Sequence, residues 1–208
     1  MTSHPFLDLL KTRLKESLPG KSAHQRMSPI RRFPTSYSPN IFKSKEGAVL
    51  ILLYKKSNEW YLPLILRPTY DGEHSGQISL PGGKKEEIDA SHIETALRET
   101  EEEIGIKTSE INFLGALTPI YIPKSNYIVH PFIGFINTSP QFVAEEKEVA
   151  KIIELPISTL SDSSKKSIFH YKYETKTLEA PSWIIEEEHI WGATAMILAE
   201  FEALINPI

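Results

Sequence analysis

Four glutamates are crowded into the last two turns of one predicted helix: Glu99, Glu101, Glu102 and Glu103. The helix is expected to begin after Ser91, because a serine followed three residues later by Glu94 forms a capping box. It is expected to end before Gly105, since glycine is favoured just beyond a helix terminus. Carboxylates at this negative end of the helix dipole are disfavoured by roughly 0.3–1 kcal/mol each. A sequence selected for stability alone would avoid this arrangement, whereas a site for divalent cations would use it.

Helical geometry brings two of these carboxylates to the same side of the helix. Glu99 and Glu103 lie about 40° apart and one turn along the axis, and Glu102 borders the same patch. Hard cations such as Mg²⁺ prefer oxygen ligands of this kind. The Gly82–Gly83 loop before the helix permits close backbone approach, so a carbonyl there could supply a further oxygen. The alternative is that the glutamates form only a solvated helix face, and the residues by themselves leave both interpretations open.

The composition narrows the class of protein. With 208 residues, 40% of them hydrophobic and 24% charged, the chain is typical of a globular protein built mainly from one domain. A net charge of −4 argues against a nucleic-acid surface. There is no apolar run of about 18 residues that could span a membrane, and we see no secretory signal. The absence of cysteine excludes disulfides, thiol nucleophiles and cysteine-based zinc sites, and we expect a cytoplasmic location.

The hydrophobic patterns predict an α+β fold. Helices are expected over 3–18, 91–104 and 191–204, with an irregular connection over 19–46. Strands are expected over 47–54, 60–66, 76–81, 111–122 and 127–137, with a turn at 57–59 between the first two. Residues 145–155 are interpreted as helical or mixed, and 157–176 have no assignment. Because strands come in runs with few helices between them, we expect a mixed sheet. Residues 1–46 are expected to pack on a main domain of residues 47–208.

The segment from Gly83 to Ile106 resembles the Nudix box, G-x5-E-x7-R-E-U-x-E-E-x-G-U, in which U is a bulky apolar residue. Its second half carries the match: Arg98, Glu99, Glu102, Glu103, Gly105 and Ile106. The first acid is instead Asp89, one extra residue separates it from Arg98, and Thr100 fills an apolar position. The resemblance implies a Nudix-type α/β/α sandwich with a mixed sheet, here with an added N-terminal helix. It also implies hydrolysis of a nucleoside diphosphate linked to another group, with Mg²⁺ or Mn²⁺ as cofactor.

The aspartate and the extra residue resemble a Nudix subgroup that cleaves coenzyme A. Members carry L-T-x-R-S…H-x-G-Q-V-x-F-P-G-G before the box, and this chain has residues 66–68 (LRP) and 74–83 (HSGQISLPGG). Residues 190–195 (IWGATA) resemble a later segment of the same subgroup. Three positions depart from its usual serine, phenylalanine and second arginine: Pro68, Leu80 and Gly72.

The resemblance further implies roles for single residues. The expected metal ligands are Glu99, Glu103, Glu102 and the carbonyl of Gly83. The expected catalytic residues are Glu102, Arg98 and Glu148. Glu148 precedes a valine where the subgroup carries a Glu-Val pair. Two interpretations of Glu148 are left open with equal weight: a general base or extra metal ligand, and a surface residue without a role. The expected substrate-binding residues are Arg67, His74, Lys84 and Gln77. His92, inside the box, is expected to be exposed and without a role.

The function hypothesis that follows is metal-dependent hydrolysis of coenzyme A or acyl-CoA to 3′,5′-ADP and (acyl-)4′-phosphopantetheine. A second hypothesis is hydrolysis of another nucleoside diphosphate derivative, such as ADP-ribose, NADH or a nucleotide. A third is a catalytically inactive nucleotide-binding module, which the intact glutamates argue against. The expected partner is a small-molecule substrate, with neither nucleic acid nor membrane, and a homodimer is left open.

Overall fold

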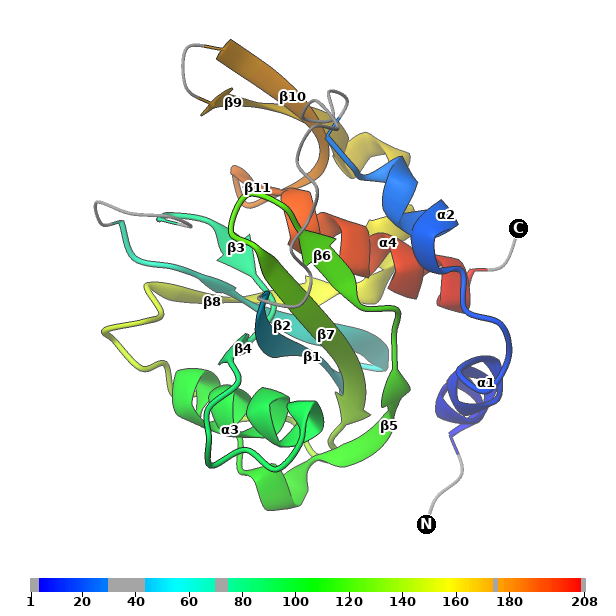
Figure 1. Ribbon diagram of the computed structural model, residues 1–208. Helices are drawn as coiled ribbons and strands as arrows, with labels where there is room; N and C mark the ends of the chain where they lie inside the picture. The colour runs from blue at the N-terminus through cyan, green and yellow to red at the C-terminus, as the bar shows by residue number, and fades with distance from the viewer. Residues whose placement is uncertain (1–3, 30–43, 70–74, 174–175, 207–208) are drawn as a thin grey trace.

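The computed structural model describes residues 4–29, 44–69, 75–173 and 176–206 (Figure 1). The α-helices are α1 (Pro5–Arg13), α2 (Gly20–Arg26), α3 (His92–Ile104) and α4 (Gly192–Ile205). The strands are β1 (Lys45–Lys56), β2 (Glu59–Leu66), β3 (Ile78–Ser79), β4 (Gly82–Lys84), β5 (Asn112–Ala116), β6 (Ile120–Ile122), β7 (Tyr127–Phe135), β8 (Lys151–Pro156), β9 (Lys166–Tyr173), β10 (Lys176–Ile185) and β11 (Glu188–Ile190). No helix in the described ranges is long and apolar enough to cross a membrane.

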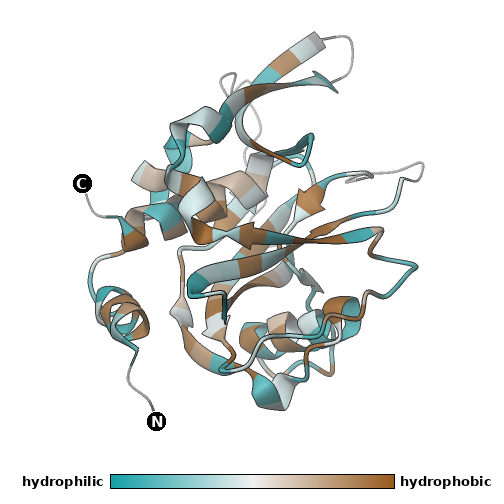
Figure 2. Ribbon diagram, turned by 180° about the vertical axis from the view of Figure 1, so that it is seen from behind, coloured by the Kyte–Doolittle hydropathy of each residue, from teal (hydrophilic) through white to brown (hydrophobic). Residues whose placement is uncertain are grey.

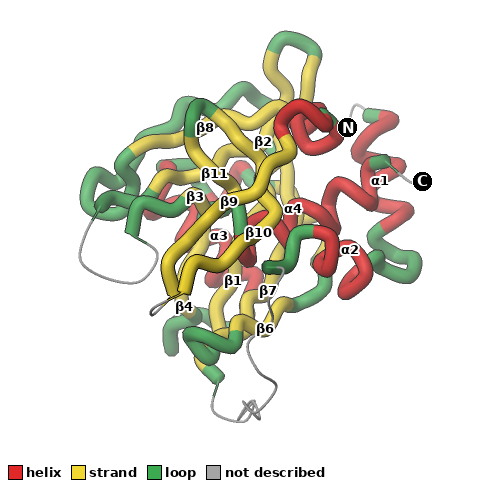
Figure 3. The backbone as a smooth tube through the Cα atoms, turned by 90° about the horizontal axis from the view of Figure 1, so that it is seen from above, coloured by secondary structure: helices red, strands yellow, loops and turns green. Residues whose placement is uncertain are grey.

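The central sheet is mixed, as expected. Its strands run in the order β3-β2-β1-β7-β5, with β4 paired to β1, β6 to β7 and β8 to β2. β1 is antiparallel to β2 and parallel to β7. A smaller sheet has the order β11-β10-β9, and its β9–β10 hairpin projects from the top of the molecule in Figure 1 and lies toward the viewer in Figure 3.

Alternation along β1 fills a hydrophobic core on each face of the sheet. Ile51 and Leu53 pack in a cluster with α4, while Leu50 and Leu52 pack in a second cluster that includes Ile104 of α3. Successive side chains of a strand point to opposite faces, so one continuous apolar run supplies both cores. Figure 2 shows hydrophobic residues gathered along the central strands and α4. The helices lie on both faces, which confirms the α/β/α sandwich.

Two local predictions are confirmed by the backbone. Ser57 and Asn58 have φ of 48° and 70°, as a two-residue turn between antiparallel strands requires. Ser91 caps α3 by accepting a hydrogen bond from the Glu94 N–H at 3.4 Å. Gly105 ends the helix in the left-handed conformation with φ of 74°. The acidic turns therefore lie at the C-terminal end of the helix, where the sequence placed them.

The predictions after residue 140 and before residue 45 were less successful. The helical interpretation of 145–155 is wrong, because a turn precedes β8, which pairs with β2. The unassigned stretch contains short 3₁₀ turns and β9, and the sequence analysis missed β10 and β11. The connection over 19–46 contains α2, which was also missed. These strands and the short helix α2 depend on their packing partners rather than on their own periodicity.

α2 is joined to α4 by a buried ion pair. The Glu200 carboxylate is fully buried and lies 2.8 Å from Nε2 of His24. It also accepts hydrogen bonds from the Gly20 N–H at 3.0 Å and from the Thr118 hydroxyl at 2.7 Å. Burial alone would raise the pKa of Glu200, but the bonds from His24 and Thr118 outweigh it and hold this pKa below its ordinary value. The Glu200 carboxylate thus joins three segments of the chain: α2, the loop between β5 and β6, and α4 itself.

Glu200→Ala is expected to lower the free energy of unfolding by about 3 kcal/mol at neutral pH, since it leaves a buried histidine without its partner. Because the folded-state pKa of Glu200 is depressed, its stabilisation is present above the unfolded-state pKa and is lost as the pH falls through the folded-state pKa. Urea denaturation of parent and variant should therefore differ less in acid. Glu179→Ala, in an exposed pair with His170, is the control and should cost under about 0.5 kcal/mol. Equal losses in both variants would contradict the prediction.

Candidate active site

Glu103 is the most buried acid of the predicted site. Its side chain is 1% exposed, accepts a hydrogen bond from the Gly82 N–H at 2.8 Å and lies 3.6 Å from the Arg67 guanidinium. Burial is the main cause that raises the pKa of Glu103 to about 7, and the charges of Glu99 and Glu148 add to it. The hydrogen bond from the Gly82 N–H and the positive charge of Arg67 lower the pKa of Glu103, but they offset the rise only in part. A cation beside Glu103 would favour its ionised form.

Glu99 lies one helical turn before Glu103 and faces the glycine loop. A Cβ built on Gly83 would lie only 2.3–2.5 Å from the carboxylate atoms of Glu99, so the glycine makes room for this side chain. Burial raises the pKa of Glu99, and the negative charges of Glu102 and Glu148 raise it further. The positive charge of Arg98 lowers this pKa but does not cancel the rise. The carboxylate of Glu99 and the backbone of Gly83 are therefore in direct contact, as a shared cation would need.

Arg98 holds the loop and the acids together. Its Nε and one terminal nitrogen donate to the two carboxylate oxygens of Asp89, both at 3.0 Å. Its other terminal nitrogen lies 2.9 Å from both Glu99 and Glu102. Asp89 is buried and also accepts from the Thr95 hydroxyl, and the hydrogen bonds from Arg98 hold its pKa well below the usual range. The sequence analysis did not identify Asp89 as the partner of Arg98.

Glu102 and Glu148 are at the solvent side of the site. Glu102 is 57% exposed beside Arg98. Both line one pocket together with Glu145 and Lys147. The turn before β8 places Glu148 in this pocket beside Glu102, and its charge raises the pKa of both Glu99 and Glu103. Its role as base or extra ligand stays a prediction.

Of the four residues expected to bind substrate, two contact the acidic site directly. Arg67 forms an ion pair with Glu103. Lys84 has an exposed side chain, and its backbone carbonyl accepts a hydrogen bond from Arg98. Gln77 is half-buried, and its carbonyl accepts from the Arg67 N–H. His74 lies outside the described residues.

Gly47 and Tyr127 also lie at the site and were missed by the sequence analysis. A Cβ on Gly47 would lie 2.4 Å from the Gly83 carbonyl oxygen and 2.7 Å from the Tyr127 ring. Burial, and then the charge of Glu99, raises the pKa of Tyr127. Gly47 could have been noticed as the glycine that opens the long apolar run, but Tyr127 had no signal in the sequence because β7 brings it from a distant segment.

These residues fit a divalent cation. The charges of Glu102 and Glu148 raise the pKa of Glu99, and those of Glu99 and Glu148 raise the pKa of Glu103, a repulsion that a cation would relieve. The space that a Cβ would fill at Gly83 lets an oxygen-bearing backbone approach Glu99. All these donors are oxygen atoms, the type that Mg²⁺ and Mn²⁺ prefer.

Comparison with known proteins agrees with this geometry. The family model for the NUDIX domain matches residues 44–173. The uncharacterized Nudix hydrolase NudL of Yersinia enterocolitica is 35% identical over 181 residues, which are 83% of this chain and 86% of that protein. NudL of Yersinia pestis is 35% identical over 156 residues, 74% of this chain and 77% of its own.

Among solved structures, a MutT/nudix family protein from Enterococcus faecalis aligns over 96% of this chain and 73% of its own, with 15% identity and a TM-score of 0.48. The family match and the NudL relatives are sufficient, and they show that this chain belongs to the Nudix hydrolases, divalent-metal-dependent enzymes that cleave pyrophosphate bonds.

Proposed function

We propose that this enzyme uses Mg²⁺ or Mn²⁺ to hydrolyse the pyrophosphate of coenzyme A or acyl-CoA. The observation that carries the hydrolytic part is the contact of Glu99 with Gly83 next to the buried Glu103. The substrate is supported by the resemblance of residues 66–68, 74–83 and 190–195 to the CoA-cleaving subgroup. The box variation that marks this subgroup has a structural counterpart, because Asp89 is the carboxylate that fixes Arg98.

The proposed reaction splits one P–O–P bridge with one water molecule. When bound, the cation neutralises the pyrophosphate and makes its phosphorus more open to attack. Glu99, Glu103 and the Gly83 carbonyl would hold the cation, and Glu102 would be a further ligand. Arg98 keeps Glu99 and Glu102 in place, and Arg67 and Lys84 face the substrate phosphates. Glu148 accepts the proton of the attacking water, whose oxygen bonds to one phosphorus while the other phosphate leaves with the bridging oxygen and its electron pair.

A substrate panel tests the proposal. Parent enzyme is incubated with Mg²⁺ or Mn²⁺ at mildly alkaline pH with CoA, acetyl-CoA, ADP-ribose or NADH, and the products are separated by chromatography. We expect 3′,5′-ADP and the phosphopantetheine product from CoA, and none without added metal. Intact CoA together with cleaved ADP-ribose or NADH would overturn the CoA assignment. Tight nucleotide binding without any cleavage would instead support an inactive binding module.

A further inference from the structure

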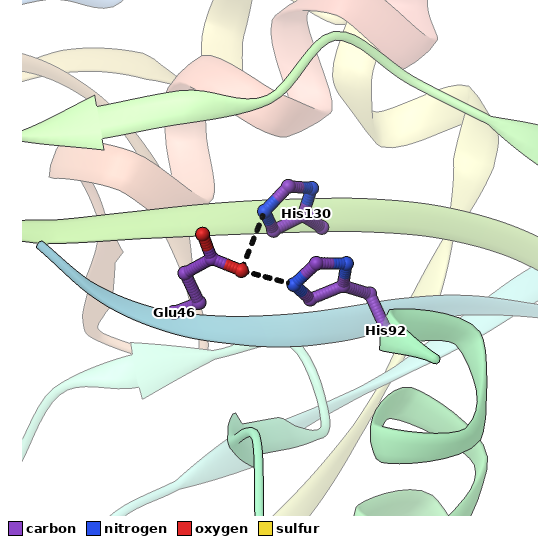
Figure 4. Close-up of side chains that lie close together, drawn as sticks. All are labelled: Glu46, His92 and His130. Atoms are coloured by element: carbon purple, nitrogen blue, oxygen red, sulfur yellow. Dashed lines mark hydrogen bonds and ion pairs between the residues drawn. The ribbon is translucent and has the colours of Figure 1, made fainter. Parts of the chain in front are cut away.

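A second group of ligand-type side chains lies outside the acidic cluster. Glu46 on β1, His92 at the start of α3 and His130 on β7 each offer one ligand atom, and these three atoms lie within 4.8 Å of one another. His92 Nε2 is 2.5 Å from Glu46 Oε2, and His130 Nε2 is 3.9 Å from the same oxygen. Figure 4 shows both imidazoles turned toward this carboxylate. The expectation that His92 is exposed and without a role is therefore wrong in its first part, since only 28% of the side chain is exposed.

A simple ion pair does not explain the whole arrangement. His130 Nε2 is buried and has no hydrogen-bond partner among the described residues, and 3.9 Å is too long for a hydrogen bond to Glu46. The two imidazole rings are stacked, with centroids 3.7 Å apart and an interplanar angle of 16°. Two protonated rings at this distance would repel one another. Burial, and then the charge of His92, lowers the pKa of His130, which keeps a neutral ring nitrogen available.

We propose that Glu46, His92 and His130 form a second metal site, selective for a borderline cation such as Zn²⁺. Two neutral imidazoles and one carboxylate are a ligand set that suits Zn²⁺, which is bound tetrahedrally with one position left to water. Metal–ligand bonds of about 2.0–2.2 Å put neighbouring ligand atoms about 3.4 Å apart, between the two distances to Glu46. The stacked rings must turn apart on binding, so that the Nε2 lone pairs of both histidines point at the ion. Glu46 and His92 are 44% and 28% exposed, so the ion has a path from solvent.

The site differs from the acidic cluster in chemistry and in position. Nitrogen ligands favour Zn²⁺, whereas the oxygen ligands at Glu99 and Glu103 favour Mg²⁺ or Mn²⁺. His92 is seven residues before Glu99, which is about 10 Å along the helix. The Lys85 N–H donates to the Glu46 carbonyl, and β4 pairs with β1 directly after Glu46. A bound ion would thus tie the first turn of α3 to β1 and β7, and this inference does not depend on which substrate is cleaved.

Zinc titration of the full-length protein tests the site. Isothermal titration calorimetry with Zn²⁺ alone as ligand is run in excess Mg²⁺, which occupies the acidic cluster. We expect one Zn²⁺ per chain, and at least about tenfold weaker binding in His92→Ala and His130→Ala. His170→Ala is the matched control, because His170 also faces a carboxylate, Glu179 at 3.7 Å, but in an exposed hairpin. Unchanged affinity in the doubly substituted H92A/H130A protein, or no binding by the parent, would overturn the proposal.

A measurement on the parent protein covers the case in which a histidine variant fails to fold. Long-range ¹H–¹⁵N spectra report the ring nitrogens of each histidine. Zn²⁺ is expected to shift the Nε2 signals of His92 and His130 and to leave those of His170 unchanged. The melting temperature should rise with Zn²⁺ concentration, because the ion binds the folded chain preferentially. Shifts confined to other histidines, or no shift, would overturn the assignment.

Discussion

Glu99→Gln is expected to reduce metal-dependent turnover about a hundredfold or more while leaving the fold intact. The substitution keeps the shape of the side chain against Gly83 but removes the charge that a cation needs. A hundredfold loss in rate corresponds to about 2.7 kcal/mol of lost transition-state stabilisation, which is within the range that a bound metal ion supplies. Initial rates at saturating Mg²⁺, together with thermal melting, measure both parts of the prediction.

Glu101→Gln is the matched control on the same helix. Glu101 points away from the site and accepts hydrogen bonds from Lys107 and from the Thr108 N–H. Its replacement should leave the turnover near that of the parent and cost a little stability at the helix end. Parent-like activity of the Glu99 variant would show that Glu99 is not a ligand. Equal losses in both variants would point to a general effect of charge.

Gly83→Ala is expected to abolish most of the activity without unfolding the protein. The new Cβ would lie 2.3–2.5 Å from the Glu99 carboxylate, a distance at which one of the two must move. The nearest atoms all belong to the end of one side chain, so Glu99 turns away and the backbone stays. We expect a loss of turnover of about a hundredfold, as for the loss of Glu99 itself. The free energy of unfolding should change by about 1 kcal/mol or less.

The neighbouring glycine supplies the contrast. Gly82 has φ of 148°, and a Cβ there would lie 2.2 Å from the Ala48 carbonyl oxygen and 2.6 Å from the Val49 Cα. These are backbone atoms of β1 that cannot turn away, so Gly82→Ala should cost about 3 kcal/mol or more. Urea denaturation and rate measurements on both variants separate the two effects. A Gly83 variant as unstable as the Gly82 variant, or as active as the parent, would contradict the prediction.

Much of the local structure around the site could be predicted from the residues. Ser91, Glu94 and Gly105 set the limits of α3, because caps act through bonds within one or two turns. The spacing of Glu99 and Glu103 placed both on one side of the helix for the same reason. The apolar run of β1 indicated a strand buried on both faces. β8 was misassigned and α2 missed because their stability comes from pairing with β2 and from contacts with α4.

The sequence by itself therefore determined the Nudix box, its helix and the acids that the helix carries, since all of these depend on residues near one another in the chain. Only the tertiary structure decided which charges meet. It gave Arg98 its partner Asp89, brought Glu148 and Arg67 to Glu99 and Glu103, and turned His92 and His130 toward Glu46. Contacts of this kind depend on strand register and burial, which join segments that no local periodicity relates. The acidic helix could be predicted from the sequence, but the residues that contact it could be identified only from the tertiary structure.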